Sequence, residues 1–149
     1  MPIEISSPQA PQRKAGFVDG KIELTNGLAV SFSSSNNKPL ILIFSTDTCL
    51  VCRGEATSLA KRFSVQGLPQ NINLFTILIG AFVEDAMDFK NELAIGWDVG
   101  VESGDSLFRN FCPQRKVPCV VVQTPKDGVV FTHEGEFTVD ELESYTGAW

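Results

Sequence analysis

Two cysteines separated by two residues, Cys49 and Cys52, are the residues of this sequence best suited to chemistry. They follow an apolar run, residues 40–44, and open a segment with helical periodicity, residues 55–63. A C-x-x-C pair at the start of a helix brings both sulfurs within bonding reach. The helix N-terminus also offers unpaired N–H groups and a partial positive charge, which stabilise a thiolate. The spacing therefore predicts a redox-active dithiol.

The two thiols are expected to have different roles. Cys49 lies at the start of the predicted helix and should be the exposed nucleophile. Cys52 lies one turn further in and should be the buried thiol that resolves a mixed disulfide. Exchange of this kind requires no bound cofactor.

Composition limits the classes of partner. The chain has 149 residues, 43% of them hydrophobic and 20% charged, which fits one domain over residues 16–149. Residues 1–15 contain three prolines among polar residues and are expected to form a flexible tether. The net charge of -6 argues against nucleic acid or an anionic membrane as partner. We expect membrane attachment only through an anchor that would precede Met1.

Turn signals and hydrophobic patterns predict alternating strands and helices. Asn26-Gly27 between residues 22–24 and 28–32 indicates a two-residue β-hairpin. Further strands are expected at residues 40–44, 72–79, 117–123 and 129–132, and a short extended piece is expected at residues 95–99. Helices are expected from Cys49 to near Gly67, at residues 84–93 and 106–111, and from Thr138.

Caps and burial refine this pattern. Asp105 or Ser106 should cap the helix at 106–111, and Thr138 with Glu141 should form a capping box. The continuous apolar strand at 40–44 predicts a sheet covered by helices on both faces. Arg53 is expected on the solvated face of its helix.

The order of elements and several motifs resemble the thioredoxin fold, and more narrowly the TlpA/ResA type of extracytoplasmic thiol-disulfide oxidoreductase. The resemblance covers most of residues 16–145. It rests on the strand before C-x-x-C, Cys52-Arg53-Gly54-Glu55, Val117-Pro118, Asp127-Gly128, and Gly135 followed by Thr138 and Glu141. It implies an α/β protein with a central mixed sheet flanked by helices, here with an N-terminal β-hairpin extension.

The resemblance also implies a function. The expected protein is a monomeric reductase in the periplasm or another extracytoplasmic compartment, with or without a membrane anchor. The even count of four cysteines fits an oxidising compartment and also a cytosolic redox enzyme. Its partners would be proteins with disulfides or dithiols, including apocytochromes during cytochrome c maturation, and an upstream redox donor. In such proteins the proline matching Pro118 is cis and lies against the active-site sulfurs. The alternative is a proline on an edge strand or at the first residue of a strand. Two departures, Ser45 and Thr48 where tryptophans are usual, mean that the redox potential does not carry over.

Glu55 has two interpretations. It stands three residues after Cys52 and so projects from the same helical face, where a carboxylate of raised pKa could accept the thiol proton. The resemblance adds that relatives of the ResA type carry an active-site glutamate at the matching position. Alternatively, Glu55 is a solvent-facing acid in the first turns, favourable for the helix dipole.

A second pair of cysteines, Cys112 and Cys119, brackets the loop that contains Pro118. The two residues could be small buried hydrophobes, as free cysteines often are. They could form a structural or regulatory disulfide, or Cys119 could lie close enough to Cys49 and Cys52 to exchange with them.

Two rival functions remain open. Thr46 and Cys49 stand at the T-x-x-C spacing of peroxiredoxins, although Leu42 occupies the position where those enzymes have proline. Alternatively, the C-x-x-C thiolates could hold copper or zinc for delivery. The single histidine, His133, would be distant from them, so no resident metal is expected.

Overall fold

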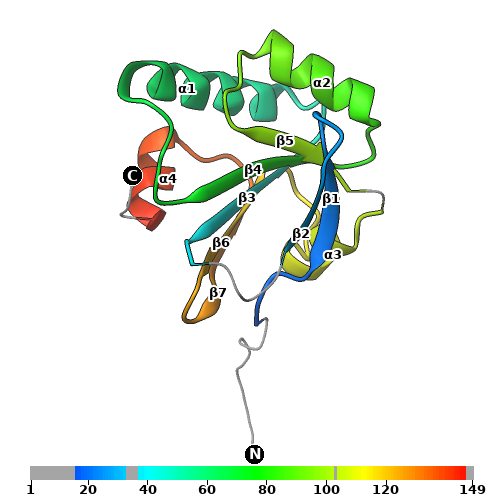
Figure 1. Cartoon of the computed structure of the whole chain (residues 1–149). Coiled ribbons are helices and arrows are strands. Elements are labelled where there is room, and N and C mark those ends of the chain that lie inside the picture. Colours follow the sequence, from blue (N-terminus) through cyan, green and yellow to red (C-terminus); the bar gives the residue numbers. More distant parts are fainter. Residues whose placement is uncertain (1–15, 33–36, 103, 147–149) are drawn as a thin grey trace, which may run out of the picture.

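The computed structural model describes residues 16–32, 37–102 and 104–146 (Figure 1). The tether expected at residues 1–15 lies outside the described residues. The strands are β1 (Gly20–Leu24), β2 (Ala29–Phe32), β3 (Leu40–Ser45), β4 (Asn73–Leu78), β5 (Asp98–Val101), β6 (Cys119–Thr124) and β7 (Gly128–Glu134). The helices are α1 (Leu50–Gln66), α2 (Val83–Glu92), α3 (Ser106–Phe111) and α4 (Val139–Thr146).

One mixed sheet of seven strands runs through the described chain in the order β2-β1-β5-β4-β3-β6-β7. Strands β3, β4 and β5 are mutually parallel, whereas β1 and β6 pair antiparallel to their neighbours. The carboxyl ends of the three parallel strands therefore meet at one edge. Cys49 follows β3 at this edge, and the Ile79 N–H after β4 donates to the Ser45 carbonyl at 2.9 Å.

Alternate residues of β3 face two different cores. Ile41 and Ile43 pack with residues of α1, α2 and α4, while Leu42 and Phe44 pack with residues of α3 and the N-terminal hairpin. Figure 1 shows α1 and α2 over one face of the sheet and α3 on the other. Burial on both faces explains why every residue of this strand is apolar except Ser45, and it confirms the expected α/β arrangement.

The hairpin loop and the start of β5 differ in detail from what the sequence pattern indicates. The hairpin loop has three residues rather than two, because the Leu24 carbonyl accepts the Gly27 N–H and the Leu24 N–H donates to the Leu28 carbonyl. The extended piece expected at residues 95–99 becomes a strand, β5, only from Asp98. The Lys90 ammonium donates to the carbonyls of Ile95 and Trp97, so these groups are satisfied by a side chain instead of a neighbouring strand.

The helix caps show one confirmed expectation and one correction. Thr138 and Glu141 form the capping box before α4, with reciprocal bonds of 2.8 and 3.1 Å. Asp105 is the N-cap residue of α3, as expected, but neither it nor Ser106 caps the helix through its side chain. Instead, a carboxylate oxygen of buried Glu102 accepts the Leu107 N–H at 2.8 Å. None of the described helices is both long and apolar enough to cross a lipid bilayer.

Candidate active site

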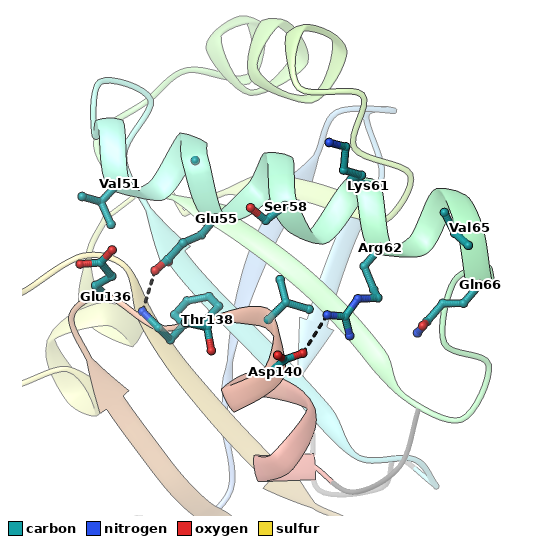
Figure 2. Close-up of a pocket in the computed structure, with 13 residues that line it drawn as sticks. Val51, Glu55, Ser58, Lys61, Arg62, Val65, Gln66, Glu136, Thr138 and Asp140 are labelled. Carbon is teal, nitrogen blue, oxygen red and sulfur yellow. Dashed lines mark hydrogen bonds and ion pairs between the residues drawn. The ribbon is translucent and has the colours of Figure 1, made fainter.

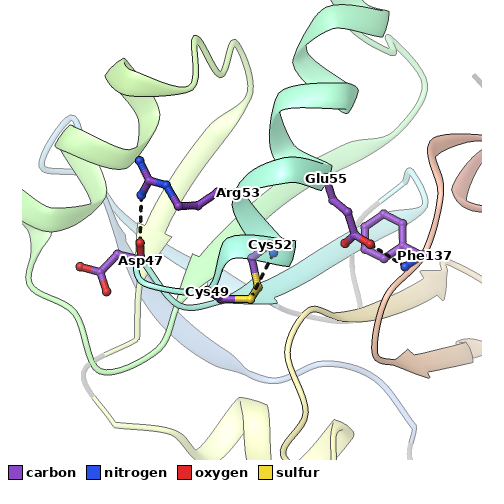
Figure 3. The surroundings of a disulfide bond; sticks show 6 residues. All are labelled: Asp47, Cys49, Cys52, Arg53, Glu55 and Phe137. Atoms are coloured by element: carbon purple, nitrogen blue, oxygen red, sulfur yellow. Dashed lines mark hydrogen bonds between the residues drawn. A yellow bond between two sulfur atoms is a disulfide. The ribbon is translucent and has the colours of Figure 1, made fainter.

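The C-x-x-C pair lies where β3 passes into α1 (Figure 3). Cys49 is the N-cap of α1 and is joined to Cys52 by a disulfide, with the Cα atoms 5.2 Å apart. The Cys52 N–H donates to the Cys49 sulfur at 3.1 Å. Cys49 is half-buried, whereas only 2% of Cys52 is exposed. The outer sulfur is thus the accessible one, and a thiolate there would have a helix N–H and the helix dipole to stabilise it.

Pro118 lies beside the inner sulfur. The Val117–Pro118 peptide bond is cis, as the resemblance implies. Pro118, Cys52 and Glu55 contribute to the lining of one small internal cavity of about 10 Å³. This volume is close to the minimum that one water molecule requires. The structure therefore brings together the four residues predicted for the site, with Cys49 completing the disulfide.

Glu55 points inward from α1 towards the loop that precedes α4. One carboxylate oxygen accepts the Phe137 N–H at 2.6 Å (Figure 3). The other oxygen, Oε1, is buried and has no hydrogen-bond partner among the described residues. One oxygen is bonded to a backbone N–H and the other is buried, so Glu55 is not the solvent-facing acid of the alternative interpretation.

Burial changes the acidity of Glu55. Desolvation raises its pKa from 4.5 to about 7, against the lowering effect of the Phe137 hydrogen bond. The nearby charges of Glu136 and Glu141 raise the pKa further. A carboxyl group that titrates near neutrality is suited to accept and return a proton at physiological pH.

The same side chain also borders a groove that is open to solvent. This groove, of about 810 Å³, runs between α1 and residues 136–140 (Figure 2). At its far end the Arg62 guanidinium bonds the carboxylates of Asp140 and Glu143, at 2.8 and 2.5 Å, which ties α1 to α4. Glu55 thus lies between the enclosed cavity beside Cys52 and the open groove.

Arg53 is expected on the solvated face of its helix, but in the structure its side chain is partly buried and lies on the opposite flank of the disulfide from Glu55. Its Nη1 donates to the Asp47 carbonyl at 2.9 Å, and its Nη2 forms an ion pair with Glu92 of α2. Its guanidinium also lies 5.4 Å from the centre of the Phe89 ring. Arg53 therefore joins the loop before Cys49 to α2. Glu92 is 39 positions away and the Asp47 group is a backbone carbonyl, so the sequence carried no signal for either contact.

Cys112 and Cys119 form a second disulfide, with Cα atoms 6.5 Å apart. The interpretation as free buried thiols is therefore wrong. Both residues are fully buried in the core that contains Phe44 and α3. Cys52 lines the cavity with Ile43, which belongs to the opposite face of β3. The arrangement offers no direct approach of Cys119 to the C-x-x-C sulfurs.

The described part of the chain contains no group of three or more His, Cys, Asp or Glu side chains arranged to hold a metal ion. His133 lies on β7, where its Nε2 is 3.0 Å from the Glu136 carbonyl oxygen. The geometry therefore gives the metal-delivery alternative no support beyond the two C-x-x-C sulfurs.

Comparison of the sequence with protein-family models and with curated proteins gives no match. Solved structures match over most of the chain. The dsbF protein of Mycobacterium tuberculosis, in its mixed oxidised and reduced forms, has a TM-score of 0.73 at 18% identity, covering 87% of this chain and 93% of its own. A secreted disulfide oxidoreductase of the same organism, homologous to E. coli DsbE, has a TM-score of 0.71 at 16% identity, with coverages of 87% and 95%.

A third similar structure is a thiol:disulfide interchange protein of the thioredoxin family from Chlorobium tepidum. Its TM-score is 0.72 at 14% identity, and the match covers 89% of this chain and 93% of that one. The chain has the thioredoxin fold, as its sequence predicts.

Proposed function

We propose that this protein is a thiol-disulfide oxidoreductase that uses Cys49 and Cys52 to reduce disulfides in partner proteins. The observation that carries the proposal is the asymmetry of the pair: an accessible sulfur caps a helix, and a buried sulfur lies one turn behind it. Thiol exchange requires an attacking thiolate in contact with the partner and a second thiol protected until the mixed disulfide has formed.

The reaction follows from this geometry. In the dithiol form, the Cys49 thiolate attacks one sulfur of the partner's disulfide, and the partner's other sulfur leaves as a thiolate. Cys52 then gives its proton to Glu55 and attacks the Cys49 sulfur, which releases the partner's second thiolate. Two electrons pass to the partner, and the Cys49–Cys52 disulfide remains. A dithiol donor upstream restores the starting state by the reverse exchange.

Glu55 acts as the proton acceptor in this scheme. Its carboxylate borders the cavity that Cys52 also lines, and one oxygen has no partner among the described residues. A pKa of about 7 lets it hold the thiol proton and then pass it to the open groove. Pro118 lines the same cavity as Cys52 and Glu55.

We place this activity outside the cytoplasm, in the cell envelope. Two disulfides occur in the described chain, and disulfides persist mainly in oxidising compartments. A structurally similar protein from M. tuberculosis is a secreted disulfide oxidoreductase. Apocytochromes and other envelope proteins with disulfides are the proposed substrates, and the protein is proposed to act as a monomer.

Equilibration with glutathione tests the proposal. The purified protein is held in buffers of graded ratios of reduced to oxidised glutathione, its thiols are alkylated, and each cysteine is scored by peptide mass spectrometry. Positions 49 and 52 are expected to change together between dithiol and disulfide. If they never become linked, or if peroxide is consumed rapidly by the Cys52→Ser variant, the proposal is wrong.

A further inference from the structure

A second open crevice lies at the same edge of the sheet as the C-x-x-C pair. It has a volume of about 820 Å³ and lies among the β4–α2 loop, the end of β5 and β1. Its lining includes four carboxylates, those of Glu23, Glu84, Glu102 and Asp105, and no lysine, arginine or histidine. The crevice is distinct from the groove beside Glu55.

Three of these carboxylates have no cationic partner among the described residues. Only Asp105 is paired, with the Arg109 Nε at 2.9 Å. Glu23 and Glu84 are exposed at the rim, so they contribute negative potential without obstructing the opening. Within the part of the chain that the structure describes, no group of side chains is suited to a metal ion. The charge therefore favours an organic cation.

Glu102 supplies an independent indication of a ligand. The residue is only 6% exposed, and its Oε2 accepts the Leu107 N–H and the Ser106 hydroxyl. Its Oε1 is buried and has no hydrogen-bond partner in the described structure. A buried carboxylate oxygen without a donor is unfavourable, and an incoming N–H donor would relieve this.

An exposed aromatic ring completes the wall of the crevice. Phe82, in the β4–α2 loop, is 77% exposed although it is one of the largest apolar side chains of the protein. An aromatic face beside carboxylates suits a guanidinium or ammonium group, which is attracted by both. An isolated anion or a purely apolar segment would find no such complement here.

We infer that this crevice binds a lysine or arginine side chain of the partner protein while the partner's disulfide is attacked by Cys49. The inference rests on the proposed function and adds a preference among its substrates. The crevice lies beside β5, two strands from β3 and so roughly 10 Å across the sheet. An extended segment covers this span with about three or four residues. The preferred partner therefore carries a basic residue about that far from its reactive cysteine.

Two synthetic peptides test the inference. Each has one cysteine in a mixed disulfide with 2-mercaptoethanol, and they differ only in having arginine or glutamine four residues away. The rate of reduction by the dithiol protein is measured by acid quench and chromatography. Wild type is expected to reduce the arginine peptide about fivefold faster at low salt, and 0.5 M salt should remove most of this preference.

Two matched variants on α2 test whether the preference for arginine arises in the crevice. Glu84→Gln removes one rim carboxylate, and Asp88→Asn removes one exposed charge from α2 outside the crevice. The preference for arginine should fall by about half or more in Glu84→Gln and stay unchanged in Asp88→Asn. Both variants should reduce the glutamine peptide at the wild-type rate.

The outcomes separate this inference from the proposed function. The inference is wrong if wild type reduces the two peptides at equal rates, or if Glu84→Gln and Asp88→Asn lose the preference for arginine equally. Neither result would contradict the proposed exchange reaction. If neither peptide is reduced although Cys49 and Cys52 are free thiols, the proposed function fails, and the inference fails with it.

Discussion

The two disulfides of this protein belong to opposite faces of one sheet. Cys49 is half-buried at a helix N-terminus, where it caps α1 and faces the edge of the sheet. Cys112 and Cys119 are fully buried between α3 and β6. A second protein can therefore reach the Cys49–Cys52 disulfide, but it cannot reach the Cys112–Cys119 disulfide.

We expect the two disulfides to have different roles, one in thiol exchange and one in stabilising the fold. Thiol exchange requires access and a stabilised thiolate, and of the two disulfides in the described chain only the C-x-x-C pair has an accessible sulfur at a helix N-terminus. The Cys112–Cys119 disulfide joins residues seven positions apart. It closes the loop that contains Val117 and the cis Pro118. We expect it to hold this loop in place and to take no part in electron transfer.

Replacing the outer cysteine should have the largest effect. Cys49→Ser removes the attacking sulfur, so reduction of a peptide disulfide should fall on the order of a thousandfold or more, to the background rate. Cys52→Ser keeps the nucleophile and should accumulate a mixed disulfide, detected by its added mass. Accumulation in Cys49→Ser instead would mean that the assigned roles are reversed.

Removing the second disulfide should weaken the fold and spare the reaction. The double variant Cys112→Ala, Cys119→Ala frees the loop in the unfolded chain, which should lower the free energy of unfolding by about 2–3 kcal/mol. Urea denaturation measures this loss. The rate of disulfide exchange by the double variant should stay within about twofold of the wild-type rate under conditions where both proteins are folded. A much larger loss of rate would show that Cys112 and Cys119 take part in the exchange reaction.

Glu55→Gln should slow the resolving step. The variant keeps an oxygen to accept the Phe137 N–H but has no group that can take the Cys52 proton. Release of the partner from the mixed disulfide should therefore slow about tenfold or more near pH 7. The pH profile of this step should also lose its inflection near 7, a change that a purely structural role would not produce. Formation of the mixed disulfide by Cys49 serves as the internal control.

The same substitution should change how stability depends on pH. An acid whose pKa is raised on folding binds its proton more tightly in the folded state, so its charge destabilises the fold progressively as pH rises from 4.5 to about 7. Glu55→Gln removes this penalty. Relative to wild type, the variant should gain on the order of 1 kcal/mol between pH 4.5 and pH 8 after allowance for solvent screening. Thermal unfolding at the two pH values measures it, and a gain that is equal at both would contradict the raised pKa.

Local patterns were sufficient to predict the order of elements and the position of the reactive pair. The hairpin signal, the apolar run of β3 and the Thr138–Glu141 capping box each act over a few residues, and the structure contains all three. The C-x-x-C spacing likewise fixed both sulfurs relative to α1. The extended piece at residues 95–99 joins the sheet only from Asp98, because the Lys90 side chain takes the place of a strand partner at Ile95 and Trp97.

The remaining features depend on contacts between distant parts of the chain. Glu102 caps α3 without belonging to any capping motif, and Cys112 pairs with Cys119 only because α3 ends beside the start of β6. Arg53 meets Glu92 across 39 positions of sequence. No periodicity or spacing in one sequence specifies such pairs, so the flank of the active site that Arg53 fixes could not be predicted.

Arg53 offers the finest test of how the accessible disulfide is supported. Arg53→Met and Glu92→Gln both break the ion pair with α2, but only the first also removes the hydrogen bond to the Asp47 carbonyl. The pair is partly exposed, so Glu92→Gln should cost less than about 1 kcal/mol of stability and leave the exchange rate unchanged. Arg53→Met should cost about 1 kcal/mol more, because a carbonyl in the loop before Cys49 loses its donor.

The rate of attack by Cys49 should follow the hydrogen bond and not the ion pair. If the Asp47 loop is held in place by Arg53, its release in Arg53→Met should slow formation of the mixed disulfide about two- to fivefold, since misplacement of reacting groups is costly. Equal rates in the two variants would mean that the loop holds its own conformation. The position of Cys49 would then be set by α1 alone, whereas the Cys112–Cys119 disulfide is held by the core that surrounds it.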